Sequence, residues 1–270
     1  MAPDREFYET VENLRTAGMG TENVAPFLYS LIRMTRSWRL MEVGLGYTTP
    51  FMAKALMDMA AEFEVDRKLL TTPGRDERKG VLSVDYYRRN HVAILHAIDD
   101  YSVEGSSANK VIETLSKLEL DGLVEVYDGD YRGMSKRIDP GTLPLDLVWF
   151  DCGGLSDYVD FIEEFWPLIN PDGGLLLLHY TYWDTAKRYD GTEPAQLVLN
   201  PIANEIKRQQ AKAGVKAKFE VLSLLEPHKT RQGSVTMIRR LGQSSMVRNM
   251  DLQDDIKSFA RDEIKPLLKL

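Results

Sequence analysis

The chain has 270 residues, of which 43% are apolar and 28% are charged, a composition that excludes a disordered polypeptide. Its 34 Lys and Arg against 41 Asp and Glu give a net charge of −7, which argues against wrapping nucleic acid or binding an anionic membrane, because both need clustered cations. The single cysteine, Cys152, excludes an intramolecular disulfide and a Cys-based zinc cage. Because membrane-span and signal-peptide patterns are both missing, we expect a cytoplasmic protein.

Short apolar runs alternate with helix-length segments along most of the chain. The predicted strands, the last of them weaker than the others, are Arg39–Val43, Val81–Asp85, Leu147–Asp151, Leu175–His179 and Leu123–Tyr127. Intervening segments such as 111–118 and 158–168 have apolar residues at three-to-four spacing, which is typical of helices. This alternation indicates right-handed crossovers and a mostly parallel sheet.

The last third of the chain changes character. Its two strand-like runs, Phe219–Leu225 and Ser234–Arg240, are too close for a crossover helix, so an antiparallel hairpin at the sheet edge is predicted. Two segments look added: Ala61–Gly80, predicted as an exposed excursion before the second strand, and the polar loop Thr185–Pro194. We expect a single domain in three parts: a helical segment 1–38, a core 39–241 and a C-terminal helix 242–270.

The most informative segment is the turn from the first strand into a predicted helix body at Phe51–Met59. Gly44 and Gly46 let the backbone turn tightly there and approach a ligand. A dinucleotide-binding loop has a third glycine, whose place Thr49 occupies. Glu42, just before the turn, is a poor neighbour for phosphates but a good one for a cation. A plain strand-to-helix turn is the alternative interpretation.

Acidic residues follow two other predicted strands. Asp85 closes the second, where an acid accepts both ribose hydroxyls of a bound nucleoside; a solvated acid or a helix cap is the alternative. Asp130 follows the third and is a candidate acceptor for an adenine amino group, or else an ordinary turn residue. Because open α/β sheets bind ligands at the carboxyl ends of their strands, we expect these acids and the glycine turn to form one site.

These motifs resemble class I S-adenosylmethionine-dependent methyltransferases, above all the small-molecule O-methyltransferases of the catechol and caffeoyl-CoA type. The glycine turn resembles the family's cofactor turn, with its glycines closer together. The strand Leu147–Asp151 and the segment Trp166–Gly174 resemble the family's fourth strand and its Gly-Gly entry into the fifth, and Leu225–Arg240 resembles the terminal hairpin. The resemblance runs from about residue 18 to 241. It implies an α/β, Rossmann-like fold: a seven-stranded mostly parallel sheet with helices on both faces and an antiparallel terminal hairpin.

The resemblance also implies S-adenosyl-L-methionine as the cofactor and an enzyme of small-molecule metabolism. Asp151 would lie near the methionine end of the cofactor and near the acceptor. The expected partners are a small-molecule acceptor and, as is common among such enzymes, a second copy in a homodimer, without nucleic acid or membrane. The implied cofactor-binding residues are Glu42, Gly44, Gly46, Thr48, Asp85, Asp130 and Asp151.

The family's catalytic pattern is incomplete in this chain. Many members hold a divalent cation with an Asp after strand four and an Asp-Asn pair after strand five, but here that pair aligns with His179-Tyr180, and the family's lysine base has no match. Because a single Asp–His pair offers few oxygen ligands for Mg²⁺, no metal is predicted. The alternative is a softer metal such as Zn²⁺, Mn²⁺ or Fe²⁺, which an imidazole ligand suits. His179 is then the candidate base, with Asp151 and Tyr180 helping to align the acceptor. The alternative is that His179 only hydrogen-bonds cofactor or backbone.

Other functions stay open. An N-methyltransferase of a small amine or amino acid needs less help from a base. A nicotinamide-dependent oxidoreductase fits the glycine turn, although Thr49 and the terminal hairpin count against it. A cofactor-binding partner subunit without turnover would fit the missing lysine and Asp-Asn pair. His91 and His96 fall on a predicted helix, where an ordinary helix face is favoured over a metal pair.

Overall fold

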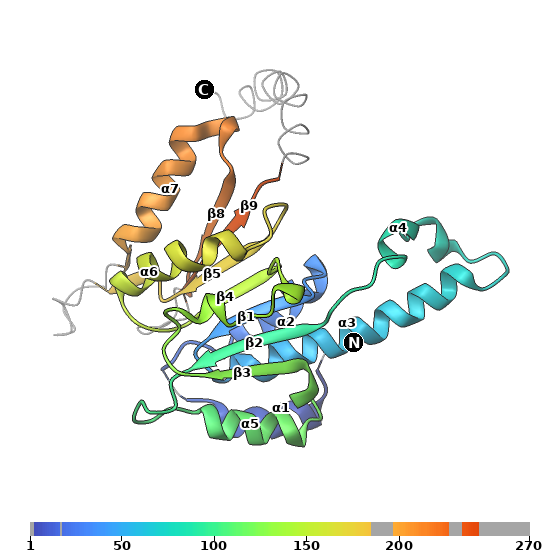
Figure 1. The fold of residues 1–270 in the computed structure, drawn as a ribbon, viewed down its shortest axis with the longest axis horizontal. Helices are drawn as coiled ribbons and strands as arrows, with labels where there is room; N and C mark the ends of the chain where they lie inside the picture. The colour runs from blue at the N-terminus through green and yellow to red at the C-terminus, as the bar shows by residue number, and fades with distance from the viewer. Residues whose placement is uncertain (1–2, 17, 185–196, 227–233, 243–270) are drawn as a thin grey trace, which may run out of the picture.

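The computed structural model describes residues 3–16, 18–184, 197–226 and 234–242. Its central feature is a seven-stranded sheet in the order β3-β2-β1-β4-β5-β9-β8 (Figure 1). Strands β1 to β5 are parallel to one another, whereas β9 runs antiparallel to β5 and β8. The predicted sheet and terminal hairpin are therefore confirmed. The strands are β1 (Arg39–Val43), β2 (Ile94–Asp99), β3 (Val124–Asp128), β4 (Leu147–Phe150), β5 (Leu175–His179), β8 (Phe219–Leu224) and β9 (Val235–Arg240).

Helices pack on both faces of this sheet, so its central strands are buried on two sides (Figure 1). Along β4, Leu147 and Trp149 join one apolar cluster, while Val148 and Phe150 join the other. This two-residue alternation is what a strand imposes, and burial of both faces explains why the sequence is apolar throughout. The helices are α1 (Arg5–Val11), α2 (Val24–Thr35), α3 (Thr48–Thr71), α4 (Val84–Tyr87), α5 (Ala108–Lys117), α6 (Leu155–Phe165) and α7 (Pro201–Ala213).

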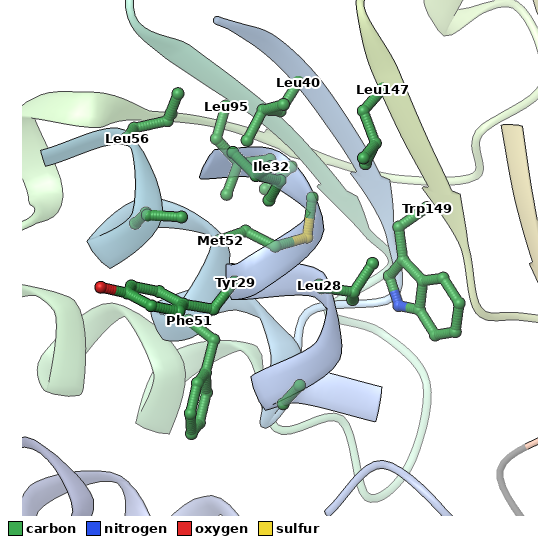
Figure 2. Packing of buried hydrophobic residues seen from close by; sticks show 14 of the residues in the cluster. Leu28, Tyr29, Ile32, Leu40, Phe51, Met52, Leu56, Leu95, Leu147 and Trp149 are labelled. Atoms are coloured by element: carbon green, nitrogen blue, oxygen red, sulfur yellow. The ribbon is translucent and has the colours of Figure 1, made fainter. Parts of the chain in front are cut away.

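The larger cluster lies between the sheet and helices α2 and α3. Figure 2 shows Leu28 and Ile32 of α2 and Met52 of α3 packed beside side chains from the strands. All three residues are fully buried, which fixes the start of α3 against β1. Because burying a large apolar side chain contributes roughly 1.5–3 kcal/mol, this packing holds the turn between β1 and α3 in place.

The second strand of the sheet is not the one predicted from the sequence. Val81–Asp85 was predicted as a strand, but Val81 is 84% exposed and Val84–Tyr87 forms the short helix α4, capped by Ser83. The strand in that place is β2, whose Leu95, Ala97 and Ile98 are fully buried. A central strand needs two buried faces, and only the later run supplies them.

The segment Ala61–Gly80, predicted as an exposed excursion, is at least partly exposed at every residue except Phe63. Helix α3 continues through its first half to Thr71, and only the remainder is loop and a short 3₁₀ turn. The far half of α3 projects beyond the sheet together with α4 (Figure 1). The far half of α3, the loop after it and α4 together lengthen the connection between β1 and β2.

Two further strands, β6 (Tyr182–Asp184) and β7 (Leu197–Leu199), form a small antiparallel pair that the sequence analysis does not predict. The predicted polar loop Thr185–Pro194 and nearly all of the predicted C-terminal helix 242–270 lie outside the described residues. Within the described ranges, no helix combines the length and apolar character needed to cross a membrane.

Candidate functional site

The turn after β1 is held from both sides by the neighbouring strands. Gly44 has a φ of +98°, and a Cβ there would lie 2.6 Å from the carbonyl oxygen of Asp151, so the position requires glycine. The Leu45 N–H donates to Oδ2 of Asp99 at 2.7 Å, and the Gly46 N–H donates to Oγ1 of Thr49 at 3.0 Å. Two backbone N–H groups of the turn are therefore already used. A dinucleotide site would need such groups for its pyrophosphate.

Glu42 lies beneath this turn and is fully buried. The Thr48 hydroxyl donates to Oε1 of its carboxyl group, while Oε2 is buried and has no hydrogen-bond partner within the described part of the chain. Burial raises the pKa of Glu42 to about 8; the nearby charges of Asp151 and Asp99 also raise it, and the hydrogen bond from Thr48 acts in the opposite direction. The site thus gathers three carboxyl groups, Glu42, Asp99 and Asp151, which we call the acidic rim.

Asp99 occupies the position that the sequence analysis assigned to Asp85. Asp85 lies on α4, where its side chain is 83% exposed and 3.5 Å from Arg88, so it does not end a strand of the sheet. Asp99 ends β2 and also accepts a hydrogen bond from the Ser106 hydroxyl at 3.0 Å. The signal for it was present in the sequence, because Ile94–Asp99 is also an apolar run closed by an acid.

His96, predicted on a helix, is instead a buried residue of β2. Its ring contacts the Tyr127 hydroxyl at 3.1 Å and Oγ1 of Thr142 at 2.9 Å. His91 stacks on Trp38, with ring centroids 4.9 Å apart. Both histidines therefore have packing roles. That neither of them binds a metal stays a prediction.

Asp130 follows β3, as expected, but its carboxylate is engaged. The Arg132 backbone N–H and guanidinium each donate to it at 2.8 Å. Arg132 in turn contacts Asp157 at 2.5 Å on α6. Asp130 is thus part of a surface ion-pair group that competes with the predicted contact to adenine.

Asp151 and His179 meet at the carboxyl ends of β4 and β5. Nδ1 of His179 is 2.5 Å from Oδ1 of Asp151, and the histidine is only 3% exposed. The Tyr158 hydroxyl donates to the His179 carbonyl, and the Trp149 ring lies 5.1 Å from the imidazole. Among the residues that the structure describes, Nε2 of His179 is buried without a hydrogen-bond partner. No sequence pattern identifies Tyr158 and Trp149 as supports of this histidine.

Tyr180 extends the site toward solvent. It has a φ of +58° and is 38% exposed, with its ring edge-on to His179 at 5.2 Å. Its backbone N–H donates to the carbonyl of Ser234 at 2.8 Å, which ties the end of β5 to the start of β9. The left-handed backbone therefore belongs to a held turn that presents the phenol beside the imidazole.

The donor set at the ends of β4 and β5 does not fit a magnesium site. Asp151 and His179 offer one carboxylate and one imidazole, whereas Mg²⁺ prefers oxygen ligands. Over the described part of the chain, no cluster of three or more His, Cys, Asp or Glu is placed to hold a metal ion. Burial raises the pKa of the neighbouring Cys152 to about 12, so its thiol stays protonated near neutral pH.

Comparison with solved structures places this geometry in a known fold. An O-methyltransferase of Streptomyces achromogenes, TomG, solved with S-adenosylmethionine, has a TM-score of 0.54 at 16% identity over 89% of this chain and 91% of its own. An O-methyltransferase of Bacillus cereus, solved with SAH, has 0.54 at 14% identity over 89% and 93%. A putative O-methyltransferase of Klebsiella pneumoniae has 0.52 at 16% identity over 89% and 91%. This chain has their fold.

At the level of sequence the chain stands apart. No protein-family model matches it, and no curated protein sequence matches it. The shared fold therefore supports the expected Rossmann-like class, while the roles of individual residues rest on the geometry described above.

Proposed function

We propose that this chain is an S-adenosylmethionine-dependent methyltransferase that transfers a methyl group to an oxygen of a small molecule. The observation that carries the proposal is the Asp151–His179 pair, whose buried Nε2 lacks a partner and lies at the same sheet edge as the glycine turn. Support comes from the fold, which is that of O-methyltransferases solved with S-adenosylmethionine or SAH.

The acidic rim suits a cationic cofactor. When bound, S-adenosylmethionine supplies a methyl group on a positively charged sulfur. Glu42 and Asp151 would stabilise that charge, because opposite charges attract strongly where water is excluded. Asp99 would bind the ribose hydroxyls. A carboxylate accepts about four hydrogen bonds, so the two from Leu45 and Ser106 leave room for two more from the ribose.

His179 would act as the general base. Because Nδ1 faces the Asp151 carboxylate, the proton of a neutral ring lies on Nδ1 and the lone pair on Nε2. Nε2 would take the proton from the acceptor hydroxyl as the acceptor oxygen bonds to the methyl carbon and the carbon–sulfur bond breaks, which leaves a neutral thioether as the leaving group. Asp151 would then stabilise the imidazolium, while Trp149 and Tyr158 hold the ring in place. Tyr180 would contact the acceptor.

The test is turnover of purified His179→Gln and Asp151→Asn proteins. A candidate-metabolite screen with the wild-type chain, scored by mass spectrometry for added methyl groups, first supplies an acceptor. His179→Gln removes the base and should lower kcat by about 10²–10⁴-fold while cofactor affinity changes little, whereas Asp151→Asn should lower both kcat and cofactor affinity. His91→Gln is the matched control and should keep wild-type turnover. Wild-type rates in His179→Gln would refute the base assignment, and a screen without any methylated product would refute the activity.

A further inference from the structure

Two register partners in the middle of the sheet have buried polar atoms with complementary hydrogen-bonding capacity. Glu42 on β1 pairs with Trp149 on β4, and both side chains are fully buried. Trp149 belongs to the larger apolar cluster, as does Leu40, which lies two residues before Glu42 on the same face of β1. An ionised Oε2 of Glu42 accepts hydrogen bonds and Nε1 of Trp149 donates one, but neither atom has a partner among the described residues.

We propose that Trp149 is a positioning residue for Glu42, and that its indole N–H stabilises the Glu42 carboxylate through one buried water. Neighbouring strands lie about 4.7–4.9 Å apart, and two hydrogen bonds that meet at one water span up to about 6 Å. Figure 2 shows the nitrogen of Trp149 on the side of the ring that faces Leu28 of α2 and the end of β1. A single water can therefore bind both side chains, as buried waters commonly do.

The charged groups that face Glu42 do not stabilise its carboxylate. Asp99 at the end of β2 and Asp151 after β4 both carry negative charge, which opposes ionisation of Glu42. The imidazole of His179 on β5 is directed at Asp151, with 2.5 Å between Nδ1 and Oδ1. Stabilisation of a negative charge on Glu42 in the ligand-free chain therefore depends on hydrogen-bond donors.

The two helices that cover this face supply a donor to one oxygen of Glu42. The Thr48 hydroxyl of α3 donates to Oε1, whereas α2 contributes the apolar, fully buried side chains of Leu28 and Ile32. The indole N–H of Trp149 suits the other oxygen, Oε2. Because an indole donates a hydrogen bond and accepts none, it favours the ionised carboxylate over the neutral carboxyl group.

The use of this arrangement in catalysis rests on the proposed function. A carboxylate held by Thr48 at Oε1 and through Trp149 at Oε2 keeps one orientation. It would then present its negative charge to the sulfonium ion of S-adenosylmethionine, where water is excluded and opposite charges attract strongly. In this role Trp149 acts through Glu42 rather than on the cofactor itself.

Titration of Glu42 in the ligand-free chain tests the proposal. The infrared band of its protonated carboxyl group, identified as the band missing from Glu42→Gln, gives the midpoint. Trp149→Phe keeps an aromatic ring but removes the donor to the charged form, so the midpoint should rise by at least about 1 pH unit. Trp38→Phe is the matched control, because it removes an indole N–H of the same cluster that donates to Tyr86 at 2.8 Å; it should leave the midpoint unchanged. An unchanged midpoint in Trp149→Phe would overturn the proposal.

A second measurement leaves Trp149 in place, so it holds even if Trp149→Phe does not fold. The chain has four tryptophans, and Trp38→Phe, Trp166→Phe and Trp183→Phe assign the indole N–H signal of Trp149 in a nitrogen–proton NMR spectrum by elimination. Neither measurement uses the cofactor, so failure of the proposed function would not affect the result. The Trp149 signal should shift with the titration of Glu42 in the wild-type chain and stay constant in Glu42→Gln. A constant signal in the wild-type chain over the same pH range would overturn the proposal.

Discussion

Glu42 is the residue whose environment departs most from that of an exposed carboxyl group. It is fully buried, one of its oxygens has no hydrogen-bond partner, and the other two acids of the rim raise its pKa further. A neutral carboxyl group is the stable form of such a residue up to about pH 8 when no cation is near. A cationic ligand would favour the ionised form of Glu42 instead. The charge state of Glu42 would therefore depend on whether the proposed cofactor is bound.

The free energy of unfolding of the ligand-free protein should therefore depend on pH through Glu42. With a pKa of about 8 when folded, against roughly 4.3 when unfolded, Glu42 contributes stability that is complete below pH 4 and is lost between pH 4 and pH 8. We expect the wild-type chain to lose about 1–4 kcal/mol more over this range than Glu42→Gln. Urea unfolding at several pH values measures the difference. The exposed Asp85→Asn is the control, and a Glu42→Gln profile parallel to the wild type would contradict the raised pKa.

At the scale of elements, the position of β2 decides which acid ends the strand beside the glycine turn. Asp99→Ala removes the acceptor of the Leu45 N–H and the proposed ribose contact, so we expect cofactor affinity to fall by about 1–3 kcal/mol. Asp85→Ala should leave the affinity unchanged, because that side chain is exposed on α4. Titration of both variants with SAH compares them directly. Loss of affinity in Asp85→Ala alone would restore the original assignment.

The sequence predicts those elements whose residues are apolar enough to indicate that they are buried. The uninterrupted apolar runs of β4 and β5 and the glycine turn after β1 indicate buried strands and a ligand-binding edge without knowledge of the fold. The strand β2 was missed because Val81–Asp85 has the same local pattern as a strand and precedes it in the chain. Only tertiary packing, which buries Leu95 and exposes Val81, distinguishes them.

The same limit applies to the candidate site. That Asp151 and His179 end neighbouring strands was expected, since the carboxyl ends of parallel strands meet at one edge. The sequence pattern does not encode the directions of side chains. It therefore could not predict the 2.5 Å contact between Asp151 and His179 or the hydrogen bond from Tyr158 to the His179 carbonyl. The engagement of Asp130 by Arg132 has the same origin.

At the scale of the whole molecule, the arrangement of charge distinguishes between ligand classes. The net charge of −7 is accompanied by three carboxyl groups gathered at one sheet edge. Two N–H groups of the adjoining turn are already bonded to Asp99 and Thr49. A pyrophosphate would meet repulsion and few donors at this edge, whereas a sulfonium ion would meet opposite charge.

The most direct measurement is a calorimetric titration of the full-length chain with S-adenosylmethionine and, in parallel, with NAD⁺. We expect one site for S-adenosylmethionine with a Kd on the order of 1–100 μM and no saturable heat for NAD⁺. Saturable binding of NAD⁺ together with no heat from S-adenosylmethionine would rule out the proposed cofactor.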